Sequence, residues 1–379
     1  MPSGRNRKNK IIVMNSLTRN FIVGILVLVC VILLVLCGYV ILRNVGKQGI
    51  YEQNQVVNLE QLTENLSDIL PTQPPVEPDS VITEEYQVTE LEEGQIYYNG
   101  QVWQYNEEIM TFLFMGIDSR TGIAEEKTPG SAGQSDVIVL LVANPHTKEI
   151  KVININRDSM AEIKRYDTDG NFIGVMEGQL ALQYAYGDGR IESCEMTRNL
   201  VSELFYGIPI HGYAAMAMDC IATINDAVGG VEVTVMNDMT WADKSWKEGT
   251  KLHLMGNDAM RYIRKRNFTS SELGTNIDRI NRQKQYLTLF ADKLKAKVKE
   301  NITFPVTLYS KVQKDLVTSF SLDQITYLAG ELLDYNVAVD GFVSISGSSG
   351  MGEKFEEFYV DETALKDLII TTFYEKVTE

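Results

Sequence analysis

Several short motifs that mark common enzyme classes are missing from this sequence. Its 379 residues contain no GxSxG nucleophile elbow, no GxxxxGKS phosphate loop and no GxGxxG dinucleotide motif. The three histidines are scattered and form no HExxH pair. The sequence therefore gives no support to acyl-serine chemistry, to nucleotide-phosphate binding or to a zinc site.

Cysteine is also scarce, with four residues in the chain. Four cysteines without paired spacing form neither a dense disulfide scaffold nor a metal site. Cys30 and Cys37 lie in an apolar N-terminal run, and Cys194 and Cys220 lie in the body of the chain. We expect Cys194 and Cys220 to be free buried thiols, although an oxidising compartment would allow them to pair.

Positive charge is absent from residues 48–119, which hold fourteen Asp and Glu but no Lys or Arg. The whole chain is acidic as well, with a formal net charge of −16. The segment PTQPPVEP at 71–78 is too rich in proline to form regular structure. We therefore expect residues 43–94 to be an acidic, flexible linker.

Charge of either sign is absent from residues 21–42, an apolar run of 22 residues that is long enough to span a bilayer as a helix. The basic residues before it are Arg5, Arg7, Lys8, Lys10 and Arg19, with no acid among them. Because Lys and Arg favour the cytoplasmic side, we expect a cytoplasmic tail over 1–20, a signal-anchor helix over 21–42 and an exported remainder. A cleaved signal peptide is the alternative, but no small-residue cleavage site follows the run.

Residues 95–379 alternate between strand and helix patterns. IYYNGQVWQY, with Asn-Gly at 99–100, predicts a hairpin, and two apolar runs within 136–158 predict two antiparallel strands. Strands alternate with helices, but hairpins join several of the strands. This pattern indicates an α/β fold (mixed α+β), with a central mixed, largely antiparallel sheet that is flanked by helices. The expected helices are 178–187, 192–206, 219–228, 254–264, 276–300, 305–315, 321–334 and 361–377, and the other strands are 111–118, 210–218, 231–235 and 341–346.

Two acidic residues stand at the ends of predicted strands: Asp118 in GIDSR and Asp136 in SDVIVL. Carboxylates on neighbouring strands are suitable ligands for a hard divalent cation such as Mg²⁺. Each could instead cap a turn or a helix. Arg157 follows the apolar run KVININ, so it stands at a strand end where it could point into a crevice. The alternative is that Arg157 forms an ion pair on the surface.

Arginine is concentrated in one window of this acidic chain, which consists of residues 261–283 and holds five arginines and one lysine. In an extended segment, Arg264 and Arg266 would project to the same side. On the helix that follows, Arg279, Arg282 and Gln283 would share one face near the N-terminus, where anions are favoured. Because an arginine can donate two parallel hydrogen bonds to phosphate oxygens, the window predicts an anion-binding site. Few aromatic residues interleave the window, so we expect no nucleic acid as a partner.

Six segments of residues 110–300 together resemble the LytR–CpsA–Psr family: GIDSR, SDVIVL, INRDSM, LQYAYGDG, INDAVGGVEVTV and YIRKR followed by DRINRQ. Members are membrane-anchored enzymes of the bacterial cell envelope. The resemblance implies a phosphotransferase that moves teichoic acid, or capsular or secondary wall polysaccharide, from undecaprenyl pyrophosphate to peptidoglycan through a phosphodiester bond. It also implies a single-pass protein of the bacterial cell membrane whose LytR–CpsA–Psr domain, residues 95–379, is extracellular.

The same resemblance assigns roles to residues of this chain. It implies that Asp118 and Asp136 bind Mg²⁺ or Mn²⁺. Among the arginines, it implies a catalytic role for Arg157, Arg264, Arg266 and Arg279. The side chains expected to face the pyrophosphate are Arg120, Arg157, Arg264, Arg266, Arg279, Arg282 and Gln283.

This chain departs from the family pattern at two positions. Asn156 replaces the proline that usually precedes the motif arginine, and Asn276 replaces an aspartate that is a suspected general base. Asp278 or Glu272 would then be the base, or solvent or the metal would deprotonate the acceptor. This loss leaves two other functions open, a non-catalytic membrane regulator or glycopolymer-binding protein and a hydrolase of the lipid pyrophosphate.

Overall fold

The computed structural model describes residues 39–52, 62, 91–119, 123–126, 128–265, 267 and 272–377. The predicted cytoplasmic tail and most of the predicted membrane segment lie outside these residues. Among the described residues, no helix is long and apolar enough to cross a membrane.

A six-stranded sheet forms the centre of the domain, in the order β11-β8-β3-β4-β5-β12. The strands are β3 (Met110–Ile117), β4 (Ser135–Asn144), β5 (Glu149–Ile155), β8 (Gly212–Ala217), β11 (Leu316–Thr318) and β12 (Asn336–Ser344). The pairs β3–β4, β4–β5 and β8–β11 are antiparallel. The pairs β3–β8 and β5–β12 are parallel. The predicted mixed, largely antiparallel sheet is confirmed.

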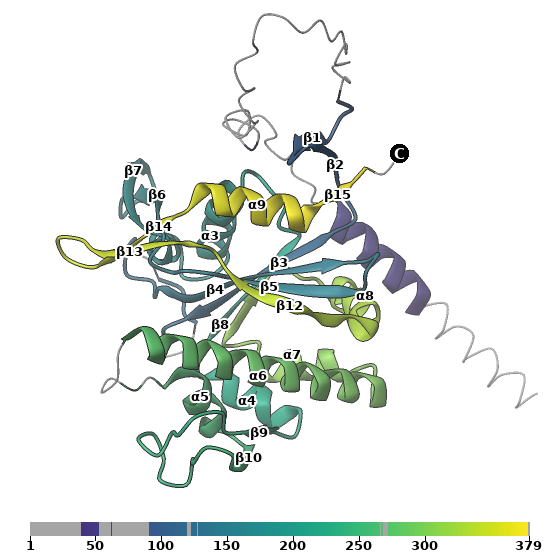
Figure 1. Ribbon diagram of the computed structural model, residues 1–379, viewed down its shortest axis with the longest axis vertical. Helices are drawn as coiled ribbons and strands as arrows, with labels where there is room; N and C mark the ends of the chain where they lie inside the picture. Colours follow the sequence, from purple (N-terminus) through teal and green to yellow (C-terminus); the bar gives the residue numbers. More distant parts are fainter. Residues whose placement is uncertain are drawn as a thin grey trace, which may run out of the picture.

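Helices cover the sheet on two sides (Figure 1). One side carries η2 (Leu180–Tyr186), α3 (Ile191–Leu204) and α9 (Glu362–Phe373), and a large apolar core fills the space between them and the sheet. The other side carries α4 (Cys220–Ala227), α5 (Asn257–Arg264), α6 (Glu272–Glu300) and α7 (Phe304–Val312). Here β9 (Val231–Thr234), β10 (Lys251–Leu254), α5 and α6 enclose a second, smaller core around Trp246.

Hairpins surround this central sheet. The predicted first hairpin is confirmed as β1 (Gln95–Tyr98) and β2 (Gln101–Tyr105), joined by Asn99 and Gly100, whose φ angles of 50° and 77° suit a primed two-residue turn. The hairpins β6 (Met160–Tyr166) with β7 (Phe172–Gln179), and β13 (Gly347–Met351) with β14 (Glu356–Val360), were not predicted. Strand β15 (Tyr374–Lys376) adds to β2. The helix expected over 178–187 is the 3₁₀ helix η2, which begins only at Leu180.

A helix over residues 39–51 lies against one end of the sheet, beside α8 (Leu322–Glu331) and η3 (Leu332–Asp334) (Figure 1). Ile50 is completely buried, and the carbonyl of Gly49 accepts a hydrogen bond of 2.9 Å from Gln324 Nε2. Arg43 forms an ion pair of 3.2 Å with Glu331. The first residues of the expected flexible linker are therefore helical and packed on the domain.

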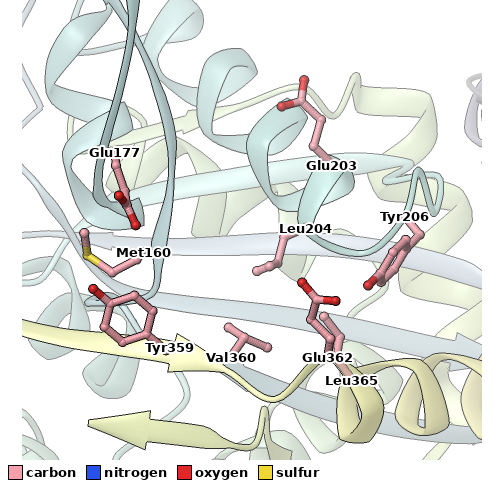
Figure 2. Close-up of a pocket in the computed structure, with 9 residues that line it drawn as sticks. All are labelled: Met160, Glu177, Glu203, Leu204, Tyr206, Tyr359, Val360, Glu362 and Leu365. Carbon is pink, nitrogen blue, oxygen red and sulfur yellow. The ribbon is translucent and has the colours of Figure 1, made fainter. Parts of the chain in front are cut away.

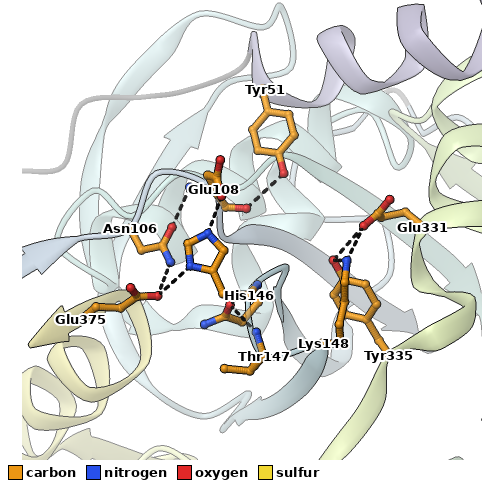
Figure 3. A network of polar contacts seen from close by, with 10 residues as sticks. Tyr51, Asn106, Glu108, His146, Thr147, Lys148, Glu331, Tyr335 and Glu375 are labelled. Carbon is orange, nitrogen blue, oxygen red and sulfur yellow. Dashed lines mark hydrogen bonds and ion pairs between the residues drawn. The ribbon is translucent and has the colours of Figure 1, made fainter.

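Polar contacts surround the same end of the sheet (Figure 3). The Tyr51 hydroxyl donates to the carbonyl of Glu108, and Lys148 in the β4–β5 turn pairs with Glu331 at 2.9 Å. Nearby, His211 is buried and its Nδ1 accepts a hydrogen bond from the Thr111 amide at 3.1 Å. Burial lowers the pKa of His211 to about 4, so this histidine is a neutral, structural one.

Both body cysteines, Cys194 and Cys220, are free and buried, as expected. Burial raises the pKa of the Cys220 thiol to about 11, which keeps it protonated and unreactive.

Gly46 tests whether the helix over 39–51 is docked. A Cβ atom at Gly46 would lie 2.2 Å from the backbone oxygen of Asp323, so Gly46→Ala must move one backbone away from the other. In an undocked helix the same change would favour helix by about 1 kcal/mol. We expect Gly46→Ala to lower hydrogen-exchange protection over 39–51 by about tenfold, as overpacking costs about 1–3 kcal/mol.

Val45→Ala is the matched control, because Val45 is 50% exposed on the same helix. Its exchange should resemble that of the parent protein. Equal or greater protection in Gly46→Ala would show that the helix does not pack on α8.

Candidate functional site

The two strand-end carboxylates lie at the same end of the central sheet. Asp118 directly follows β3 and Asp136 is the second residue of the antiparallel neighbour β4. The backbone carbonyl of Gln134 accepts hydrogen bonds from the amides of both residues, each at 3.1 Å. This shared acceptor holds the two backbones together. The side chain of Asp136 is 20% exposed and that of Asp118 is 56% exposed, so both are accessible.

Arg157 reaches the same place from a turn after β5. The side-chain oxygen of Asn156 accepts a hydrogen bond from the Asp158 amide at 3.1 Å. The backbone carbonyl of Asn156 accepts another from the Ser159 amide at 3.0 Å. An asparagine that bonds its own backbone two residues on stabilises a turn without proline. The replacement of proline by Asn156 therefore leaves the turn that carries Arg157 intact.

The Arg157 guanidinium lies between two carboxylates. Its Nη1 donates to Asp136, and its Nε lies 3.4 Å from Asp158. Asp158 in turn accepts a hydrogen bond of 2.7 Å from Gln179, which orients it. Burial lowers the pKa of Arg157, but the charges of Asp136 and Asp158 raise it by more, so the guanidinium stays protonated.

Arg264 comes to the sheet end from the opposite helical layer. It is the last residue of α5, and its Nη2 lies 3.9 Å from the carboxylate of Asp118. Arg264 therefore ends the helix expected over 254–264, and the chain becomes extended only at Lys265, so the extended segment considered for Arg264 and Arg266 does not include Arg264. The result is a four-membered charge cluster in which Arg157 pairs with Asp136 and Arg264 pairs with Asp118.

Arg282 and Gln283 do not point to this cluster, contrary to the expectation that they face an anion. Arg282 is only 3% exposed, and its guanidinium donates to the carbonyls of Tyr262, at 2.9 Å, and Lys265. Gln283 Nε2 donates to the carbonyl of Ile263 at 3.2 Å. These carbonyls belong to the last turn of α5, where helical carbonyls lack partners within the helix. Arg282 and Gln283 thus fix the end of α5 that carries Arg264.

The helix that bears Arg279 and Arg282 also starts earlier than expected. Helix α6 begins at residue 272, so Arg279 lies about two turns inside it rather than in its first turn. The helix dipole acts only within the first turn and gives little help there. Arg279 itself is partly buried on α6.

Asp278, the candidate substitute base, accepts a hydrogen bond of 2.5 Å from Asn237 Nδ2. Asn237 lies in the loop after β9, 41 residues earlier, and no local pattern in the sequence marks it as a partner. Arg120 and Arg266 lie outside the described residues, as do the side chains of Glu272 and Asn276.

The carboxylate pair has the chemistry for a hard cation, since Mg²⁺ is usually held by one or two carboxylates together with phosphates and water. Among the described residues, no group of three or more His, Cys, Asp and Glu side chains could hold a metal ion. Asp118 and Asp136 could therefore supply two ligands to Mg²⁺ or Mn²⁺, and the substrate and water would have to supply the others.

A model of the LytR_cpsA_psr family matches residues 77–370 of this chain. The polyisoprenyl-teichoic acid–peptidoglycan teichoic acid transferase TagU of Bacillus cereus is 28% identical over 271 residues, which cover 69% of this chain and 77% of that protein. The transferase TagV of Bacillus subtilis is 28% identical over 191 residues, which cover 48% of this chain and 43% of TagV. The chain thus spans less than half the length of TagV in that match.

The crystal structure of TagV from B. subtilis is similar in fold. It aligns with a TM-score of 0.51 and 22% identity, and it covers 70% of this chain and 96% of the TagV chain. At this identity the likeness concerns the fold.

The clamp formed by Arg282 predicts a measurable loss of stability. Arg282→Met leaves the carbonyls of Tyr262 and Lys265 without their buried donors, and we expect it to lower the free energy of unfolding by about 3 kcal/mol. Chemical denaturation measures this. Lys299→Met, at an exposed position near the end of the same helix, is the control and should change stability by less than about 0.5 kcal/mol. Equal effects of the two substitutions would contradict the clamp.

Proposed function

Because this chain belongs to the LytR–CpsA–Psr family, we propose that it is a phosphotransferase of the cell envelope. It moves an anionic glycopolymer, such as teichoic acid or a capsular or secondary wall polysaccharide, from undecaprenyl pyrophosphate to peptidoglycan. The names of TagU and TagV describe transfer of teichoic acid to peptidoglycan by those proteins. The observation that carries the proposal is the cluster in which Arg157 and Arg264 face Asp136 and Asp118 at one end of the sheet.

The cluster suits a substrate with two phosphates and a cation. The two guanidinium groups are forked donors for phosphoryl oxygens, and the two carboxylates are ligands for the cation. In the free protein Arg157 is paired with Asp136 and Asp158, and Arg264 with Asp118. When the substrate binds, the arginines exchange carboxylate for phosphate oxygens. Asp118 and Asp136 would hold Mg²⁺ or Mn²⁺, which supplies Lewis-acid stabilisation of charge on those oxygens.

The reaction is an in-line displacement at the phosphorus that carries the glycan. A hydroxyl oxygen of the acceptor forms a new O–P bond, and the P–O bond to the carrier phosphate breaks. The hydroxyl loses its proton to a base, and polyprenyl phosphate leaves. Arg157 and Arg264 stabilise the charge that builds on the transferring and leaving oxygens.

Asp278 is the base that we propose. Asn276 carries an amide and cannot accept the proton in this role. Asp278 has one carboxylate oxygen held by Asn237, which orients the group and leaves its second oxygen available to the acceptor.

We further propose the membrane topology indicated by the sequence, with residues 1–20 in the cytoplasm, an anchor over 21–42 and the domain outside. Val40, Ile41 and Leu42 support it, because these apolar side chains on the helix over 39–51 are exposed in the described part of the protein. Side chains of this kind are stable on a helix surface when lipid surrounds them.

Arg157 provides the first test. We expect Arg157→Ala to lower the rate of glycan transfer from a lipid-linked donor to peptidoglycan oligomers by about 100-fold or more, the usual effect of losing a charge-stabilising donor. Arg198→Ala, which removes an arginine paired with Glu195 on α3, should leave the rate unchanged. Release of glycan into water, independent of acceptor, would instead identify a hydrolase. Donor binding without any product would identify a binding protein.

The proposed metal is tested separately. We expect EDTA to abolish transfer and Mg²⁺ or Mn²⁺ to restore it, because the two carboxylates would otherwise repel the substrate phosphates. Asp136→Asn should raise the metal concentration needed for half-maximal transfer by about tenfold, since it removes one of two charged ligands. Full activity in EDTA would rule out the metal.

A further inference from the structure

A cavity of about 350 Å³ lies on the α3 and α9 side of the sheet. Its walls come from β6, β7, the end of α3, β14 and the start of α9 (Figures 1 and 2). Its volume is within the range of small-ligand sites, about 300–1,000 Å³. The floor is apolar, with Leu204 and Val360 in the middle of the cavity.

Carboxylates and tyrosines line the two ends of this cavity. Glu177 and Tyr359 lie together at one end, and Glu362 and Tyr206 lie at the other (Figure 2). The Tyr359 hydroxyl donates a hydrogen bond of 2.9 Å to Glu357, which is the main cause of the raised pKa of Tyr359, and the charge of Glu177 adds to it. Burial is the main cause of the raised pKa of Tyr206, and the charge of Glu362 adds to it. The third carboxylate, Glu203, forms an ion pair of 2.7 Å with Lys164.

Glu177 and Glu362 differ from Glu203 in that neither has a salt bridge among the residues that the structure describes. An acidic cavity with apolar and aromatic walls repels phosphate-rich polymers. The ring of Tyr206 already has a cation, because the Lys366 ammonium lies 5.1 Å from its centroid. The cavity favours ligands that present hydroxyl groups and a positive charge, since its carboxylates accept hydrogen bonds from both.

The wall of this cavity is continuous with the turn that carries Arg157. Met160, which lines the cavity, is three residues from Arg157, so their Cα atoms are at most about 11 Å apart. The turn is bonded to β14, because the Phe358 amide donates to the carbonyl of Asp158 at 3.0 Å. Gln179, two residues from Glu177, donates to Asp158 at 2.7 Å.

From this geometry we infer that the cavity between β7, β14 and α9 binds the acceptor, a segment of peptidoglycan whose stem peptide carries a free ammonium group. The inference rests on the proposed function and adds a second subsite to it. The charge cluster binds the anionic donor, and the acidic cavity excludes that donor and holds the cationic part of the acceptor. A glycan held at Met160 then places its hydroxyl groups toward Arg157.

Binding of a defined fragment tests the subsite. The probe is a disaccharide–peptide of peptidoglycan whose diamino acid has a free side-chain amine, compared with the same fragment acetylated at that amine. Titration calorimetry with the full-length protein in detergent should give roughly tenfold tighter binding of the free-amine fragment, as expected for a charge-assisted hydrogen bond. The double variant Glu177→Gln and Glu362→Gln should lose this preference.

The matched control is the double variant Glu232→Gln and Glu300→Gln, which removes the same charge from β9 and the end of α6. It should bind both fragments as the parent protein does. Unchanged binding in the Glu177 and Glu362 variant, or equal binding of the two fragments by the parent protein, would overturn the inference.

Transfer assays separate this inference from the proposed function. If transfer proceeds and the Glu177 and Glu362 variant keeps the acceptor KM of the parent protein, the subsite is wrong and the phosphotransferase stands. If fragment binding depends on the two glutamates but no transfer occurs with any acceptor, the phosphotransferase is wrong and the cavity remains a peptidoglycan-binding site. A rise of about tenfold in the acceptor KM, with the donor KM unchanged, supports both.

Discussion

The arrangement of the site depends on the hydrogen bonds that the buried guanidinium of Arg282 donates. It joins α6 to the last turn of α5 through the carbonyls of Tyr262 and Lys265, and Gln283 adds a bond to Ile263. Arg264 is part of that turn, and its position relative to Asp118 follows from it. A buried charge is stable only when its donors have hydrogen-bond partners. Any movement of α5 away from α6 would break the bonds of Arg282, so the position of α5 is restricted.

The second organising feature is the separation of charge within an acidic protein. At the sheet end, Arg157 faces Asp136 and Asp158 and Arg264 faces Asp118, so the arginines offset most of the negative charge and still offer two forked donors. On the other side of the Arg157 turn, the cavity with Glu177 and Glu362 is acidic. One short turn, braced by Asn156 and by the bond of Asp158 to Gln179, therefore separates two surfaces that favour opposite ligand charges.

Local patterns predicted much of the fold because most of its elements are built from local signals. The β4–β5 hairpin and the strand ends of Asp118 and Asp136 follow from apolar runs and polar turns, and these were right. The hairpin of β6 and β7 was missed because its strands are half exposed and its glycines break the alternation of polar and apolar residues. Beyond these elements, the roles of the site residues came from the resemblance rather than from spacing.

The errors at the site have a common physical cause. An arginine in a charged window is expected to be exposed, and nothing nearby in the sequence shows that Arg282 is buried against α5. The bond between Asn237 and Asp278 joins residues 41 apart and depends on the packing of the β9 loop on α6. Helix α6 starts at residue 272 rather than 276, which moves Arg279 out of the first turn. Each of these facts depends on tertiary contacts, which local patterns do not encode.

The docked helix over 39–51 has a consequence for how far the proposed lipid substrate must travel. It packs beside the β4–β5 turn, whereas Asp136 lies at the other end of β4. The strand of ten residues between them is about 30 Å long, close to the thickness of the hydrocarbon core of a bilayer. In the topology that we propose, the anchor joins one end of the domain and the proposed phosphate-binding groups lie at the other, so an upright domain would hold these groups well clear of the bilayer surface. The proposed carrier lipid would then reach them only if the domain reclines on the membrane or if the lipid is drawn out along the length of the sheet.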